Sequence, residues 1–386
     1  MAQVKPAFET FARIKVVGCG GSGGNALARM IEARIHGVEF IAVNTDAQAL
    51  HNTNAPTKIH IGKSLTKGLG AGMNPDVGKQ AAIDTKEEIG TALKGSDMVF
   101  ITCGLGGGTG TGAAPIVAEI ARDIGALTVG VVTKPFSFEG AQRMRIAEEG
   151  WHLLREKVDA LITIPNDRLL SVIDRKTPLL ESFAIVDDVL RQGVQGISDL
   201  ITISGIINVD FADVKAVMAN SGSALMGIGK ASGEDRAIEA AKIAINSPLL
   251  EVSIDGAKGV LFNVSGGTDL AMAEINEAAR IITEHIDPDA KVIFGAVLDD
   301  KLKKGEIKIT VVATGFNNGH AVQPRPAMVQ QRPNLFDNSS LEAKKSVISA
   351  IPASVSGNGL VKETFVDSSS LEDDLDIPAF IRRKMK

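Results

Sequence analysis

The residues with the clearest chemical meaning form the stretch GLGGGTGTG at 104–112, in which six of nine residues are glycine and none is lysine. Glycine loses more conformational freedom on folding than any other residue, so such a run indicates a place where something approaches the backbone closely. Backbone N–H groups at a helix start bind phosphate without a basic side chain, and we expect that helix to begin near Thr111. The stretch therefore predicts a phosphate site in which amide dipoles, helped by a magnesium ion, meet the ligand's charge.

Two more glycine-rich segments, GCGGSGG at 18–24 and KGLGAGMNP at 67–75, also follow predicted strands or lie beside strand ends. In parallel sheets, ligands bind at the carboxyl ends of the strands. Several such loops at one edge would surround a ligand larger than a single phosphate. Together with the first stretch they predict a site for a polyphosphate.

Other patterns fit the first segment as well. It contains the GxGxxG of dinucleotide-binding enzymes at 18–23 and the GxSxG of hydrolases at 20–24. A soluble NAD-dependent oxidoreductase is therefore the alternative function, although the expected ribose-binding acid is displaced, since the second strand ends in Asn44 and Asp46 follows two residues on. Glycines that only make tight turns are a further alternative. A Walker A loop is absent, because Thr57 occupies the position of its first glycine.

Elements that would position these loops can be read from apolar runs separated by amphipathic segments. Near-continuous Val and Ile runs with helices between them are typical of a parallel sheet covered on both faces, which places the chain in the α/β class. The predicted strands of this part lie at 13–20, 38–44, 97–104, 127–133 and 159–165.

A long helix is predicted over 179–203, where apolar residues recur at helical spacing, with Gly205 as its stop. A second αβ region follows at 208–316, with helices near 234–246 and 269–284 between strand-like segments. From residue 317 the sequence is polar and dotted with proline, which predicts disorder.

Composition excludes several classes of protein. The chain has 386 residues, a net charge of −5 and 44% hydrophobic residues, and it contains no apolar run of about 18 residues and no leader-like N-terminus. We therefore expect a cytoplasmic protein that neither binds nucleic acid nor inserts into a membrane. Its two cysteines, Cys19 and Cys103, stand where strands run into glycine loops and are interpreted as small buried hydrophobic residues.

The segment GGGTGTG at 106–112 resembles the signature loop of the tubulin/FtsZ family of GTPases, and the resemblance covers roughly 12–316 and the last dozen residues. It implies a Rossmann-like parallel-sheet GTPase domain, a long central helix, a second αβ domain, a disordered linker and a short tail peptide. In residues, these are an N-terminal extension at 1–12, the GTP-binding domain at 13–178, the central helix and start of an acidic loop at 179–207, an activation domain at 208–316, the linker at 317–370 and a partner-binding peptide at 371–386.

The resemblance also implies a set of GTP-binding residues. They are Gly20, Gly21, Ser22, Gly23, Gly24 and Asn25 in the first loop, Asn44, Thr45 and Asp46 in the second, Ala71, Gly72 and Asn74 in the third, Gly104, Gly106, Gly107, Gly108, Thr109 and Gly110 in the phosphate cradle, and Thr133, Pro135, Glu139, Arg143, Asn166, Phe183 and Asp187 on the ribose and base sides. The carboxylate of Asp187 suits guanine, which offers two adjacent donors where adenine has an acceptor. Phe183 lies one helical turn earlier, where its ring either stacks on the base or packs in the core. Arg143 is either a ligand residue or a solvated helix charge.

Asn208, Asp210 and Asp213 match the family's NxDxxD loop, which implies a catalytic role. Taken alone, the two acids are an ordinary helix cap and a first-turn charge. Asp187 and Gly205 are separated by about 27 Å along a straight helix, so Asp210 is expected not to reach the phosphates of its own subunit. A neighbour stacked head to tail would bring them together, and such a contact generates a filament.

The function implied by the resemblance is a GTPase that hydrolyses GTP on assembly and polymerises into the bacterial division ring, with GTP or GDP and Mg²⁺ bound. It would work in the cytoplasm at the division site, beneath the inner membrane. Its tail would bind membrane-tethering partners like FtsA and ZipA through Asp376, Ile377, Pro378, Phe380 and Ile381. A filament protein that binds nucleotide without hydrolysing it is the third possibility.

Overall fold

The computed structural model describes residues 12–170, 177–203, 205–247, 253–299 and 302–316. The linker, the tail with its five partner-binding residues and nearly all of the N-terminal extension lie outside these ranges. The strands are β1 (Ile14–Cys19), β2 (Val38–Asn44), β3 (Thr57–His60), β4 (Met98–Gly104), β5 (Leu127–Lys134), β6 (Ala160–Pro165), β7 (Gly222–Ser232), β8 (Gly259–Gly266), β9 (Lys291–Leu298) and β10 (Glu306–Thr314). The helices are α1 (Gly20–Glu32), α2 (Ala47–Asn52), α3 (Lys63–Thr66), α4 (Pro75–Asp84), α5 (Lys86–Leu93), α6 (Gly108–Asp123), α7 (Ala141–Lys157), α8 (Asn166–Leu169), α9 (Leu179–Thr202), α10 (Phe211–Met218), α11 (Arg236–Ile245) and α12 (Met272–Thr283).

One sheet in the order β3-β2-β1-β4-β5-β6-β7-β10-β8-β9 connects all the described strands. From β3 to β6 every pair is parallel, as the apolar runs predicted. All six residues of β1 are buried, because helices cover both faces of this part of the sheet. The sequence missed β3, a short edge strand in which only Ile59 is buried, so it has no apolar run.

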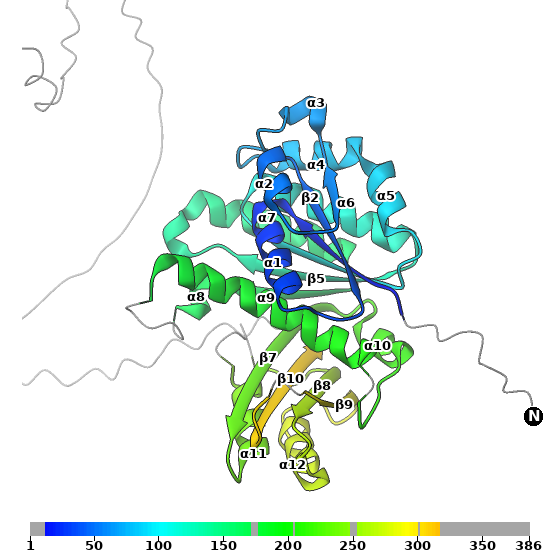
Figure 1. The fold of residues 1–386 in the computed structure, drawn as a ribbon, viewed down its shortest axis with the longest axis vertical. Coiled ribbons are helices and arrows are strands. Elements are labelled where there is room, and N and C mark those ends of the chain that lie inside the picture. Colours follow the sequence, from blue (N-terminus) through cyan, green and yellow to red (C-terminus); the bar gives the residue numbers. More distant parts are fainter. Residues whose placement is uncertain (1–11, 171–176, 204, 248–252, 300–301, 317–386) are drawn as a thin grey trace, which may run out of the picture. The chain divides into compact units, whose positions relative to one another are not determined.

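Two layers of helices cover the parallel part of the sheet (Figure 1). On one face, Leu27 and Met30 of α1 share a core with Leu190 and Val194 of α9. On the other, α4, α5, α6 and α7 cover a second core, to which these helices contribute many alanines. The glycine loops lie at the carboxyl ends of the strands between these layers, where an α/β sheet binds its ligands.

The strand β7 belongs to both halves of the sheet. Its first residues, Gly222–Ala224, pair in parallel with β6, and the rest pairs with β10 in antiparallel register. The predicted helices at 234–246 and 269–284 are confirmed as α11 and α12. Helix α11 lies directly on β7, since a Cβ on Gly227 or Gly229 would stand 1.9 Å from a carbonyl oxygen of that helix.

Helix α9 confirms the predicted long helix. It has 24 residues, which gives a length of about 36 Å. It ends at Thr202, three residues before the predicted stop at Gly205. Its middle is buried, but Phe183 near its start is 39% exposed. Among the described residues, no helix combines the length and the apolar character needed to cross a membrane.

Candidate nucleotide-binding site

The phosphate cradle is the first turn of α6. The sequence placed the start of this helix near Thr111, but it begins at Gly108, with Gly107 as its N-cap. Because glycine has a low helix propensity, the sequence pattern predicted the start of the helix too late. Contacts with α4 hold this first turn in its helical conformation. The first N–H groups of a helix have no partner inside it. The cradle is therefore a helix N-terminus whose free amides and positive dipole end suit a phosphate.

Two of the glycine amides in this region are already hydrogen-bonded within the protein. The N–H of Gly106 donates to Thr111 Oγ1 at 2.9 Å, and the N–H of Gly104 donates to Ser22 Oγ at 2.9 Å. Gly104 and Gly106 therefore shape the loop instead of offering these N–H groups to a ligand. The helix-start amides from Gly107 to Gly110 are not engaged in this way. The hydroxyl of Ser22, which accepts from Gly104, therefore has a structural role in the first loop.

Three of the predicted loops meet at the cradle. Thr45 Oγ1 and Thr109 Oγ1 are 2.6 Å apart, which joins the second loop to the cradle. The first loop comes as close, since a Cβ on Gly20 would lie 2.9 Å from the backbone nitrogen of Gly110. The third loop packs on Gly108, where an added Cβ would stand 2.8 Å from the backbone nitrogen of Asn74. The structure therefore brings together segments up to 90 residues apart in the sequence (residues 20 and 110).

Some glycines of these loops are not required by the fold. A Cβ on Gly21, Gly24 or Gly107 would meet no atom within 4 Å, and none of the three has a positive φ. Close approach of a ligand explains a glycine that neither packing nor backbone conformation demands. A cavity of about 380 Å³ opens beside Gly21 and Gly24, and its lining includes Asn25, Asn44 and Thr53. Its size is in the range of small-molecule sites.

Helix caps position the polar side chains of the second and third loops. Asp46 caps α2 by accepting from the N–H groups of Gln48 and Ala49. Asn74 caps α4 in the same way through the N–H of Asp76. Asn44, which is buried, accepts from the N–H of Asp46 at 3.2 Å. These side chains therefore fix the conformation of the loops, whatever else they contact.

On the sides predicted for the ribose (Arg143) and for the base (Asn166), polar atoms are buried without partners. Glu139 accepts from the N–H of Phe136 at 2.8 Å and pairs with Arg143 at 3.1 Å. Arg143 is thus not a freely solvated charge. Its Nε is buried and unpaired, as is Oδ1 of Asn166. Buried polar atoms normally have partners, so these two indicate a polar ligand or ordered water at this position. Thr133 and Pro135, at the end of β5 and after it, are buried.

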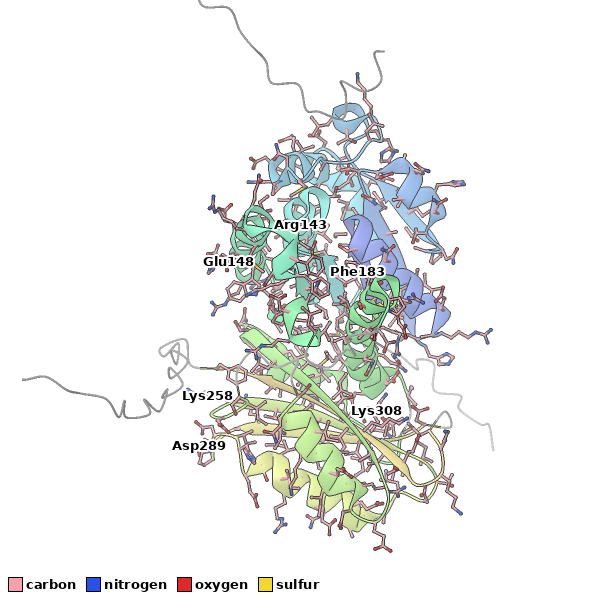
Figure 2. All side chains as sticks on the ribbon, turned by 90° about the vertical axis from the view of Figure 1, so that its left-hand side faces the viewer. Arg143, Glu148, Phe183, Lys258, Asp289 and Lys308 are labelled. Atoms are coloured by element: carbon pink, nitrogen blue, oxygen red, sulfur yellow. The ribbon has the colours of Figure 1, made fainter. Side chains whose placement is uncertain are left out.

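Phe183 presents a ring to the surface. It makes an edge contact with Phe136 at 5.6 Å and is not packed in the core, so the core alternative was wrong. Phe138, which is 64% exposed, stacks on Phe136 with ring centroids 4.9 Å apart. Figure 2 shows Phe183 on the first turns of α9 and Arg143 on α7. An aromatic ring with an open face suits the stacking of a planar base.

Asp187 lies one turn after Phe183 and makes no hydrogen bond or ion pair with any described residue. Burial raises the pKa of its carboxyl to about 6, an effect that nearby Arg29 partly opposes. The neighbouring Asp188 differs, because it accepts from Arg191 and Gln192. A half-buried carboxylate without a partner suits two adjacent ligand donors.

The three residues predicted to be catalytic lie beyond the other end of α9, and all are exposed. Asp210 caps α10 and accepts from the N–H of Asp213 at 2.8 Å, as the ordinary cap interpretation expected. Asn208 accepts from the N–H of Gly205 at 2.7 Å. A backbone bridge between Ile207 and Ala296 ties this acidic loop to β9. The structure therefore does not bring these three residues to the nucleotide loops of the same chain.

Both cysteines are fully buried directly behind the glycine loops. Burial raises the pKa of the Cys103 thiol to about 12 and holds the pKa of Cys19 well above its usual value. The interpretation of these residues as buried hydrophobic side chains is confirmed, because a thiol in this state is a poor nucleophile.

Comparisons with known proteins agree with this arrangement. Residues 13–174 match the GTPase domain of the Tubulin/FtsZ family, and residues 222–317 match the C-terminal domain of the FtsZ family. The chain belongs to the tubulin/FtsZ family of GTPases. Members of this GTPase family bind GTP and GDP, which favours the GTPase over the oxidoreductase alternative.

Solved structures of tubulin/FtsZ proteins share the fold. An empty FtsZ dimer from M. jannaschii is 51% identical, with a TM-score of 0.77, and the match covers 80% of this chain and 89% of that one. A tryptophan-to-tyrosine mutant of the same protein matches with the same identity, TM-score and share of this chain, and is covered over 92% of its own length. CetZ2 from Haloferax volcanii, a GTPγS-bound protofilament, is 20% identical with a TM-score of 0.67, and the match covers 78% and 92% of the two chains.

Proposed function

We propose that this tubulin/FtsZ GTPase polymerises head to tail into filaments of a division ring, and that each hydrolysis site is completed by the acidic loop of the adjacent subunit. The observation that carries this proposal is the position of two half-sites at opposite ends of α9. Phe183 and Asp187 lie at its start, and the exposed acids follow its end. An interface that joins unlike ends does not close on itself and so builds a filament.

In the proposed site, the helix-start amides of α6 hold the phosphates of GTP, and the first and third loops close around them. Arg143 contributes its unpaired Nε on the ribose side, and Asn166 contributes its unpaired Oδ1 on the base side. Asp187 accepts N1–H and N2–H₂ of guanine while Phe183 stacks on the ring. The remaining predicted ligand residues line or shape these loops.

Magnesium fits as an ion bound mainly by phosphate. Within the described residues, no group of three or more His, Cys, Asp or Glu side chains is arranged to hold a metal. Mg²⁺ keeps several waters and commonly takes substrate phosphate oxygens as ligands, so it needs no protein cage. When bound, it would neutralise charge that develops on the phosphates.

Hydrolysis then depends on the position of a water molecule. Asp213 and Asp210 of the next subunit would orient and polarise the water against the terminal phosphate, and Asn208 would hold the loop through Gly205. Positioning of this kind is the main task of a protein in phosphoryl transfer. Hydrolysis would thus be tied to assembly, because the complete site exists only at a junction.

Mixing two inactive variants tests the proposal. Asp213→Ala should bind GTP and polymerise but hydrolyse slowly, whereas Thr109→Arg should crowd the cradle and lose nucleotide while keeping its acidic loop. Mixtures contain junctions with an intact pocket and an intact loop. Phosphate release should therefore exceed the sum of the two proteins, rise with concentration and vanish below the assembly threshold. Glu148→Ala, an exposed acid on α7 (Figure 2), is the matched control and should behave as wild type. A flat response, with co-assembly confirmed by sedimentation, would rule out catalysis in trans.

We also propose that the tail peptide binds membrane-tethering division proteins in the manner of FtsA and ZipA partners, which would keep the filament on the cytoplasmic side at the division site. The support is the order of acidic, apolar and basic residues around Phe380. Phe380→Ala should abolish recruitment to such a tether in a pull-down and leave GTP hydrolysis within about twofold, because a short motif depends on few buried anchors. Loss of assembly in this variant would show that the tail belongs to the filament instead.

A further inference from the structure

Thr111 makes two different contacts from the first turn of α6: its hydroxyl bonds to the segment before the cradle, and its methyl packs against α7. The residue is almost fully buried in the first turn of α6. Its hydroxyl accepts from the N–H of Gly106 at 2.9 Å. Its methyl faces α7, where a Cβ on Gly150 would lie 2.1 Å from Thr111 Cγ2 and at least 3.4 Å from every other atom. Only a residue without a side chain at position 150 leaves room for this methyl.

The hydroxyl of Thr111 holds a turn that only glycine adopts readily. Gly106 has φ +97°, and a Cβ there would lie 2.9 Å from both Cγ and the carbonyl oxygen of Arg143. Arg143 and Gly150 both belong to α7. Helix α7 therefore contacts the segment before the cradle through residue 143 and the cradle helix itself through residue 150.

Helix α4 closes the cradle from its other side. A Cβ on Gly112 would stand 2.0 Å from the carbonyl oxygen of Pro75, and one on Gly78 would stand 2.4 Å from the carbonyl oxygen of Gly108. The first turn of α6, which offers its amides to phosphate, is thus held between α4 and α7. The packing is so close that one added methyl group would increase the distance between α6 and either helix. Interiors packed this closely pass a displacement on to their neighbours.

We infer that Thr111 is a positioning residue for phosphate binding, with Gly150 as its partner on α7. Its hydroxyl sets the turn at Gly106, and its methyl sets the distance between α6 and α7, so together they determine where the free amides of the cradle point. Thr111 acts through these amides and does not contact the nucleotide. The inference rests on the proposed nucleotide site and adds the device that orients it.

The test is a double-mutant cycle with ligands of decreasing charge. Gly150→Ala should push on the methyl of Thr111 and weaken GTP and GDP binding on the order of tenfold, since small misplacements of binding groups are costly. Guanosine, which has no phosphate, should bind as it does to wild type. Thr111→Ser keeps the hydroxyl but removes the methyl that spaces α6 from α7, so by itself it should weaken GTP binding about threefold. Combined with Gly150→Ala, whose new methyl occupies the vacated space, it should restore GTP affinity.

Two further variants guard the result against a simple loss of folding. Thr111→Val keeps the bulk but leaves the N–H of Gly106 buried without a partner, so GTP binding should again fall roughly tenfold while guanosine binding does not. Gly90→Ala on α5, where an added Cβ would meet nothing closer than 3.7 Å, is the control for a glycine-to-alanine change and should bind all three ligands normally.

Equal losses for GTP and guanosine in Gly150→Ala and Thr111→Val would overturn the inference, because they would indicate a general loss of structure. So would an absence of recovery in the double variant. The GTP affinities of wild type and Thr109→Arg are compared before the cycle begins. Equal affinities would overturn the proposed nucleotide site itself, which separates that failure from a failure of the inference about Thr111.

Discussion

The nucleotide loops and the acidic loop differ in the range of the contacts that hold them. Besides their local caps, the nucleotide loops contain side-chain hydrogen bonds that join distant segments, as between Thr45 and Thr109 or between Ser22 and Gly104. In the acidic loop, the side-chain bonds span three residues, from Gly205 to Asn208 and from Asp210 to Asp213. Long-range bonds fix a cavity within the chain, whereas local caps fix a shape and leave the acids exposed. The nucleotide pocket is therefore formed within one chain, whereas the acidic loop exposes its carboxylates on the surface.

The largest expected effect separates the cap from the catalytic charge in the acidic loop. Asp210→Ser keeps a side chain that can cap α10 but removes the carboxylate, so phosphate release by filaments should fall on the order of 100-fold with GTP affinity unchanged. Asp210→Ala should lose as much activity and also about 1 kcal/mol of stability, because the cap is lost. Phosphate release within twofold of wild type in Asp210→Ser would mean that this loop is only structural.

Base recognition should show a smaller effect confined to the nucleotide loops. Asp187→Ala should weaken GTP binding by about 2–3 kcal/mol and narrow the preference over ATP, because the guanine donors lose a charged acceptor. ITP, which lacks the exocyclic amine, should lose less than GTP. Competition titrations of the three nucleotides measure this. The adjacent Asp188→Asn, whose carboxylate accepts from Arg191, is the control, and unchanged discrimination in Asp187→Ala would exclude Asp187 from the base site.

The smallest effect concerns the stability of the ligand-free protein. Burial raises the pKa of Asp187 to about 6, above its value in the unfolded chain, so its charge destabilises the folded state above about pH 6 and not below about pH 4. Asp187→Asn should therefore unfold at higher denaturant concentration at pH 7.5, by on the order of 1 kcal/mol after solvent screening, with a smaller gain at pH 5. GTP binding to wild type should weaken as pH falls through 6. A variant less stable than wild type at pH 7.5 would show that the carboxylate has a partner.

Much of the fold was predictable because it depends on local patterns. Apolar runs indicated the parallel strands, and an apolar stripe indicated α9 nearly to its last residue. What was missed depends on tertiary contact. The start of α6 is set by α4 against Gly112, and no propensity scale predicts a helix in GTGTG.

The candidate site shows the same division. Glycine content located the cradle, but the sequence could not show which amides the protein itself uses, since that depends on the hydroxyls of Ser22 and Thr111. For Phe183 the sequence left base stacking and core packing open, because the residue lies on the apolar stripe, and only the structure shows that the ring is exposed. The spacing of five residues between Gly106 and Thr111 is a signal that could have indicated their bond, whereas Ser22 and Gly104 are 82 residues apart and no local spacing could indicate theirs.

The two buried thiols have a consequence for following the protein in time. Cys19 and Cys103 lie behind the cradle, where a thiol-reactive probe reaches them only when the loops separate. The rate at which the probe modifies them would thus measure how often the loops open transiently, in the way that amide exchange reports local unfolding. Bound nucleotide should slow the modification of the two thiols, and release of the nucleotide should speed it. The rate of thiol modification in the wild-type chain therefore reports how often the nucleotide pocket opens.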